Sequence, residues 1–180
     1  ARMGVPFDVW DVAAKGSPKL SDVQPYRILM WRINDSFYTS QNTISPSQQT
    51  VITDYLAGGG GFFMASMEIL SRVGAVPFRT NILNVVSFKQ RESPLDECPD
   101  CDEDHMVPSV QGAYLEPLTT GVEMALDYSQ FPVFELEPFF PNIGPDLGDI
   151  FSPGTDVVPI LLEPLSGGVA GVKSPRPRSN

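Results

Sequence analysis

The stretch GGGGFFMASMEILSR, residues 58–72, decides the fold class of this chain. Its four glycines end one element, and the apolar run FFMAS that follows predicts a buried β-strand. MEILSRVG then predicts a short helix closed by Gly74, because glycine takes the left-handed conformation past a helix end at little cost. The stretch therefore predicts a strand, a sharp turn and a helix, which is how many α/β enzymes present a nucleophile.

The residues before these glycines carry the clearest helix signal in the chain. Ser45 stands at an N-cap, Pro46 at the first helical position, and Gln48 where a capping box places Glu or Gln. Four apolar residues then recur at helical spacing on one face, namely Val51, Ile52, Tyr55 and Leu56. We expect a helix that starts at Pro46 and ends at Gly58.

Further strands are predicted at residues 7–12, 27–33, 81–88, 131–140 and 157–165. The run RILMWRI at 27–33 lacks strict alternation, which suits a strand buried on both faces. Strands that alternate with helices favour right-handed crossovers and a parallel sheet. The expected fold is therefore α/β, with a mostly parallel sheet in three layers and helices on both faces. We expect one domain over residues 1–172, with an acidic loop inserted at 89–112 and a mobile tail at 173–180.

The overall charge excludes one class of partner. Twelve basic and 22 acidic residues give a net charge of −10, whereas a protein that binds nucleic acid needs clustered Lys and Arg. No apolar run reaches the roughly 20 residues that span a bilayer. We therefore expect neither nucleic acid nor a membrane span.

Four runs carry a resemblance to a known kind of module: VPFDVWDV (5–12), YRILMWRIND (26–35), QQTVITDYLAGGGGFFMAS (48–66) and TGVEMALDYSQFPVF (120–134). Together they resemble the α/β module, related in fold to flavodoxin and class I glutamine amidotransferases, that occurs in large secreted bacterial proteins. Those proteins often carry peptidase or fibronectin-type domains. The resemblance covers roughly residues 1–172.

Relative to that family, the chain looks truncated at both ends. The opening apolar strand with its acidic residues and the closing strand are both missing from the expected pattern. In a flavodoxin-like order the first strand lies centrally, between the strands expected at 7–12 and 27–33. Its loss would leave backbone groups unpaired, so another chain, a swapped segment or a different strand order is expected to fill the gap.

The function that the resemblance implies is a non-catalytic accessory or structural module of a secreted or cell-surface bacterial protein. Its partners would be other segments of the parent polypeptide. One alternative is a structural subunit of an extracellular assembly, completed by a strand from a neighbouring chain, with a homo-oligomer as one form. The other alternative is a hydrolase that uses a degenerate nucleophile turn at residues 66–68.

The nucleophile turn argues against catalysis. In amidotransferase-like folds a Cys occupies this turn, and the matching position here falls at about Met67, which cannot attack a substrate. Ser66 is adjacent, but a serine nucleophile needs a neighbouring base, and the chain's one histidine lies far along the acidic loop. Glu68 fits the first turn of a helix, and Asp35 fits a turn after a strand. A vestigial site would be lined by Asp35, Ser66 and Glu68.

The acidic loop holds the second group of candidate residues, in LDECPDCDEDHMVP (95–108). Cys98 and Cys101 could bind zinc together with His105 and Asp102, although structural zinc sites usually show two clear ligand pairs. The density of carboxylates also permits calcium, but the regular calcium-binding loop is absent. The secreted setting implied by the resemblance favours a Cys98–Cys101 disulfide instead, with no cofactor.

Overall fold

A computed structural model describes residues 4, 6–32, 44–65, 69–74, 76–89, 109–126, 150–164 and 167–174. Within these ranges the chain divides into two compact units. The first unit contains residues 4, 6–32 and 44–64, and the second contains the described residues from 65 onward. The expectation that residues 1–172 act as one domain stays a prediction. None of the helices in these ranges is long and apolar enough to cross a membrane.

The first unit opens with an extended segment and two one-turn helices, α1 (Val12–Lys15) and α2 (Leu20–Val23). The strand expected at 7–12 is wrong, because residues 6–11 pair with no strand in the described ranges. Asp11 is the reason that the chain turns into a helix here: its carboxylate accepts hydrogen bonds from the N–H groups of Ala13 and Ala14. That N-cap begins α1 where the strand was expected to end.

Helix α3 (Pro46–Ala57) confirms the strongest sequence signal. The Ser45 hydroxyl accepts from the Gln48 N–H, and the Gln48 side chain accepts from the Ser45 N–H, which completes the capping box. Gly58 caps the other end. Ile52 and Tyr55, from the predicted apolar face, are buried in the core of the first unit with Val23 and Ile44.

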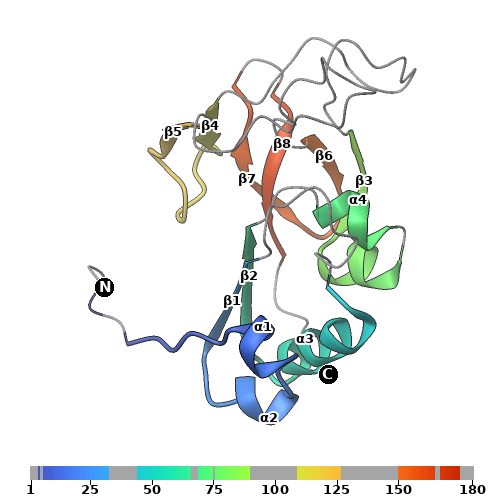
Figure 1. Cartoon of the computed structure of the whole chain (residues 1–180). Coiled ribbons are helices and arrows are strands. Elements are labelled where there is room, and N and C mark those ends of the chain that lie inside the picture. Colours follow the sequence, from blue (N-terminus) through green and yellow to red (C-terminus); the bar gives the residue numbers. More distant parts are fainter. Residues whose placement is uncertain are drawn as a thin grey trace, which may run out of the picture. The chain divides into compact units, whose positions relative to one another are not determined.

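Strands β1 (Ile28–Arg32) and β2 (Gly61–Ala65) form a two-stranded parallel sheet (Figure 1). These are the strands predicted at 27–33 and within FFMAS. The strand–helix–strand order β1, α3, β2 is also confirmed, since a parallel pair needs such a crossover. In the described ranges, β1 and β2 pair with each other and with no further strand.

In the second unit, helix α4 (Ile69–Val73) ends at Gly74, as the sequence predicts. The strand expected at 81–88 is only half right. Residues Phe78–Ile82 form a π-helical turn, η1, in which the Leu83 N–H bonds to the Phe78 carbonyl at 3.0 Å. Asn84 follows with a positive φ of 55°, and β3 (Val85–Lys89) begins directly after it.

The remaining sheets are antiparallel, which overturns the predicted fold class of a mostly parallel, three-layer flavodoxin- or amidotransferase-like sheet. Strand β3 pairs with β6 (Ile150–Pro153). A four-stranded sheet has the order β5-β4-β7-β8, with β4 at Ser109–Gly112, β5 at Glu123–Ala125, β7 at Val158–Leu162 and β8 at Val169–Lys173. Strand β4 lies inside the expected loop 89–112, and β7 confirms the strand expected at 157–165.

Connection length explains one of these antiparallel pairs, β7 with β8. Strands β7 and β8 are joined by six residues, 163–168, and the Glu163 N–H bonds across this turn to the Gly168 carbonyl. A connection this short can join only antiparallel neighbours, because a parallel crossover needs a dozen residues or more. The alternation of strands and helices predicted the order of elements correctly up to α4. From β3 onward, no helix connects one strand to the next in the described ranges. The strand expected at 131–140 lies outside the described residues.

An ion pair fixes the outermost strand of the larger sheet. The Lys173 Nζ on β8 contacts both carboxylate oxygens of buried Glu116, at 2.8 and 2.9 Å. Glu116 belongs to the connection between β4 and β5, where its carboxylate also accepts from the Leu118 N–H. The hydrogen bond from Lys173 is the main cause that lowers the pKa of Glu116 below its ordinary value.

We expect Glu116→Gln to lower the thermal stability of the second unit at neutral pH. Because the folded pKa is lowered, the ionised carboxylate contributes stability above the unfolded pKa and loses it as the pH falls through the folded pKa. Thermal melts from pH 7 to pH 3 should therefore show a difference between wild type and variant that shrinks with acid. Glu123→Gln, at an exposed position of β5, is the matched control. A constant difference at all pH values would contradict this role.

Candidate functional site

The residues singled out from the sequence lie outside the described ranges. Asp35 falls in the gap 33–43, and Ser66, Met67 and Glu68 form the gap between β2 and α4. The strand before this gap and the helix after it are confirmed, while the turn itself and the role of its side chains stay predictions. Cys98, Cys101, Asp102 and His105 fall in the gap 90–108, so the disulfide, zinc and calcium alternatives also stay predictions. The part of the chain that is described holds no cluster of three or more metal-ligating side chains.

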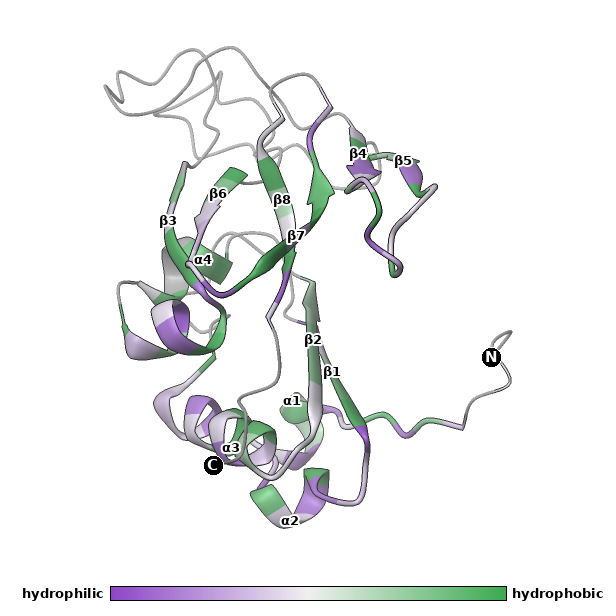
Figure 2. Cartoon of the chain, turned by 180° about the vertical axis from the view of Figure 1, so that it is seen from behind, coloured by the Kyte–Doolittle hydropathy of each residue, from purple (hydrophilic) through white to green (hydrophobic). Residues whose placement is uncertain are grey.

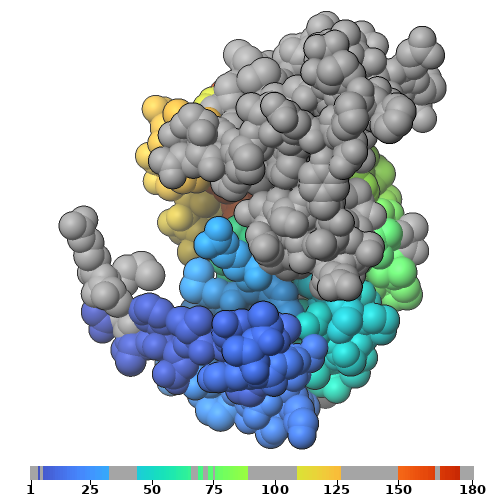
Figure 3. All heavy atoms as spheres, in the orientation of Figure 1, coloured from blue at the N-terminus to red at the C-terminus, as the bar shows by residue number. Residues whose placement is uncertain are grey.

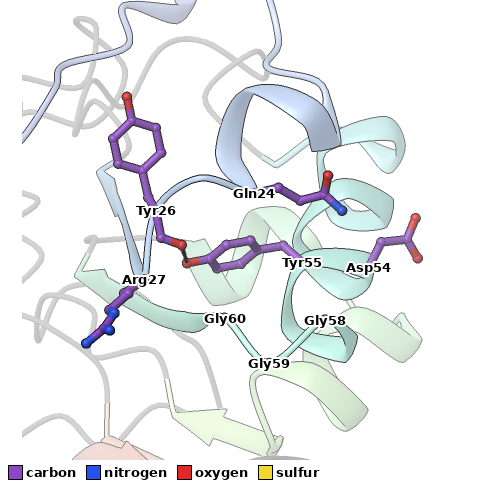
Figure 4. A pocket seen from close by; sticks show the side chains of 8 residues that line it. All are labelled: Gln24, Tyr26, Arg27, Asp54, Tyr55, Gly58, Gly59 and Gly60. Atoms are coloured by element: carbon purple, nitrogen blue, oxygen red, sulfur yellow. Dashed lines mark hydrogen bonds between the residues drawn. The ribbon is translucent and has the colours of Figure 1, made fainter.

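A hollow of about 370 Å³ lies where α3 meets the glycine loop in the first unit. Figure 4 shows Tyr55 pointing from α3 toward the backbone of Tyr26. The Tyr55 hydroxyl donates to the Tyr26 carbonyl at 2.9 Å, just before β1 begins. This bond ties α3 to the start of the sheet. The other residues that line the hollow are Gln24, Arg27, Asp54, Gly58, Gly59 and Gly60.

The glycine loop is built for close packing and not for binding an anion. Each of its four N–H groups, from Gly58 to Gly61, donates to a protein carbonyl at 2.9–3.1 Å. A loop that cradles phosphate needs free N–H groups aimed at the ligand. Gly59 has a φ of 89°, and a Cβ on Gly60 would lie 2.3 Å from the Tyr55 ring. The hollow is therefore the surface of a structural contact.

A second feature of the first unit is an apolar sheet face exposed to solvent. Ile28 and Met30 on β1 are 64% and 68% exposed, and Phe63 on β2 is 51% exposed. They share one face, because a Cβ on Gly61 would point at Ile28 and side chains alternate along each strand. Figure 2 shows hydrophobic colouring along β1. Sequence analysis missed this face by taking 27–33 as a strand buried on both sides.

The outer edge of β1 is open as well. The Gly61 N–H bonds to the Arg27 carbonyl at 2.9 Å, so Arg27 faces β2. Along a strand the N–H and C=O groups of alternate residues point to opposite edges, which turns those of Ile28 and Met30 away from β2. In the described ranges no strand lies on that side. The edge has no Pro or Lys to block another strand, and Arg32 at its end is its one charge.

Residues 6–11 lie in the same unit as an extended segment with exposed apolar side chains. Phe7 and Val9 are 66% and 73% exposed. Asp8 bonds through its carboxylate to the Tyr26 hydroxyl, and this bond is the main cause that raises the pKa of Tyr26. The Trp10 indole N–H donates to the Gly16 carbonyl at 2.9 Å. The segment covers most of the range 7–12, where the sequence predicts a strand.

No family model, curated protein or solved structure matches this chain. The resemblance to flavodoxin- and amidotransferase-like modules of secreted bacterial proteins therefore stays a prediction. The open sheet and the extended segment are the features of the described residues from which function can be argued.

We expect Gly60→Ala to destabilise the first unit by about 1–3 kcal/mol, because the new methyl group overlaps the Tyr55 ring and the ring must move. Gly58→Ala is the matched control. A Cβ on Gly58 meets its nearest atoms at 3.4–3.5 Å, which is ordinary contact. Urea denaturation followed by tryptophan fluorescence measures both. Equal effects of the two substitutions would show that the Tyr55 contact does not decide stability here.

Proposed function

We propose that this chain is a non-catalytic structural module that accepts a β-strand from another polypeptide along the open edge of β1. The proposal develops the alternative of an assembly subunit completed by a neighbouring strand. A secreted or cell-surface bacterial setting is part of the same proposal, and its support is the sequence resemblance alone. The observation that carries the binding role is the exposed apolar face of β1 beside an unpaired backbone edge.

Parallel sheets are normally covered on both faces and contain several strands. The β1–β2 sheet has two strands in the described ranges and leaves Ile28, Met30 and Phe63 more than half exposed. Small two-stranded units are marginally stable in water. The first unit compensates by tying β1 to α3 through Tyr55 and Tyr26. This bond holds β1 in place, so its outer edge could pair with a further strand.

An added strand would pair the backbone edge of β1 and cover the exposed apolar face at the same time. Its main chain would pair with the outward N–H and C=O groups of Ile28 and Met30, and its side chains would cover the apolar face. Burying a side chain such as Met30 contributes roughly 1.5–3 kcal/mol. The non-catalytic part of the proposal is supported by Met67 at the nucleophile position and by the glycine loop, whose N–H groups are all bonded within the protein.

We expect Met30→Lys to weaken assembly of the purified chain by about 10-fold or more, because it removes roughly 1.5–3 kcal/mol of apolar burial and adds a charge to the edge. Native mass spectrometry over a dilution series measures the effect. Val86→Lys is the matched control, since Val86 is an exposed strand residue, 56% exposed, on β3 of the second unit. It should leave assembly unchanged.

Hydrogen exchange over residues 27–32 tests whether the contact between polypeptides in the assembly lies along β1. In the wild-type assembly the N–H groups of Ile28 and Met30 should exchange slowly, and in the Met30→Lys variant the Ile28 N–H should exchange fast. Fast exchange of Ile28 and Met30 within an intact wild-type assembly would place the joint elsewhere and defeat the proposal. Slow exchange in a chain shown to be monomeric would also defeat it, because the edge would then be filled from within.

A further inference from the structure

We infer that the strand accepted at β1 is residues 6–11 of a second copy of this chain, added parallel to β1. The inference rests on the proposed function and adds the identity of the strand. Its starting point is that, in the described ranges, the first unit contains a β1 edge with no strand beside it and a strand-like segment that pairs with no strand. Each copy therefore carries the element that the other copy lacks.

The segment already has the form of a donor strand. Residues 6–11 form no helix or turn and are exposed throughout, and Phe7 and Val9 lie two residues apart, so they would project to one side of a strand. Figure 3 shows this N-terminal part, in dark blue, at the surface of the molecule. Pro6 stands at the start of the segment, the position in a strand where a missing N–H is tolerated.

A parallel register matches the two sequences residue by residue. On the exposed face of the sheet, β1 presents two apolar residues and then a cation, and the segment presents two apolar residues and then an anion. Parallel addition also continues the direction of the β1–β2 pair. The pairs predicted on this face are Phe7 with Ile28, Val9 with Met30, and Asp11 with Arg32.

Charge favours this partner over an arbitrary apolar strand. Each chain carries a net charge of −10, so two copies repel unless their contact surfaces are locally complementary. The acceptor strand is flanked by Arg27 and Arg32, whereas the donor segment carries Asp8 and Asp11. Opposite charges on neighbouring strands support pairing, and like charges oppose it. The opposite charges of donor and acceptor would therefore attract each other locally, although the two copies repel each other overall.

Local contacts direct the segment outward in its own chain. Asp11 caps α1, and the Trp10 indole is bonded to the Gly16 carbonyl, so the chain turns into the helix at this point. Figure 1 shows the segment running outward from α1 and crossing near the start of β1 instead of running along it. Reciprocal exchange between two copies fills both edges with one two-fold arrangement, which is a low-cost route to a dimer.

Site-directed crosslinking of the full chain tests the register. Cys98 and Cys101 are first replaced by Ser in every variant. A Val9→Cys copy is mixed with a Met30→Cys copy and treated with a short thiol-specific crosslinker. A covalent heterodimer is expected, because these two positions are opposite each other on one face. Leu29→Cys, which lies on the other face of β1, replaces Met30→Cys in the control, and its crosslinked yield should fall to background.

Each other outcome overturns the inference in a distinguishable way. Crosslinking within a single Val9→Cys/Met30→Cys chain, without dimers, would show that the segment fills its own edge. No crosslink, while exchange at Ile28 and Met30 remains slow in the assembly, would leave the proposed function standing with another segment of the second copy as donor. No crosslink together with fast exchange at these residues in an intact assembly would defeat both. Equal crosslinking at positions 29 and 30 would show non-specific encounter.

Discussion

The unpaired outer edge of β1 is the constraint on which the organisation of the first unit depends. Backbone N–H and C=O groups are strong hydrogen-bonding groups, and a strand presents half of them on each side. Strand β2 satisfies one side of β1, and the Tyr55 hydroxyl adds a bond at the Tyr26 carbonyl just before the strand. In the part of the chain that the structure describes, no strand pairs with the other side. Because of this asymmetry, in which only one side of β1 is paired, the proposed strand addition takes place on the other side.

The glycine loop makes the asymmetry possible. Gly60 lets the Tyr55 ring lie against the backbone, so that α3 is held close to the first residues of the sheet. The sheet is then supported at one end by a helix, and Ile28 and Met30 stay exposed on its face. Here the loop's N–H groups are all consumed in holding the framework together.

Local signals in the sequence predicted local structure well. The Ser45 capping box and Gly74 gave the correct ends of α3 and α4, because capping depends on residues only a few positions apart. Strand partners depend on distant residues, and here sequence reasoning failed: β3 pairs with β6, more than sixty residues along the chain, instead of joining β1 and β2. The run ILMWR looked buried on both sides because composition does not record how many layers cover a sheet.

The same residues that make strand addition possible also restrict it. An exposed apolar edge is a hazard, because any extended chain with apolar side chains could pair with it. Arg32 at the end of β1 disfavours a second copy of β1 in the same register, since like charges would then lie opposite each other. Asp8 and Asp11 keep the donor segment from pairing with another donor for the same reason. In the proposed exchange, complementary charge would therefore favour donor–acceptor pairing over self-pairing of either strand, even though each chain carries a net charge of −10.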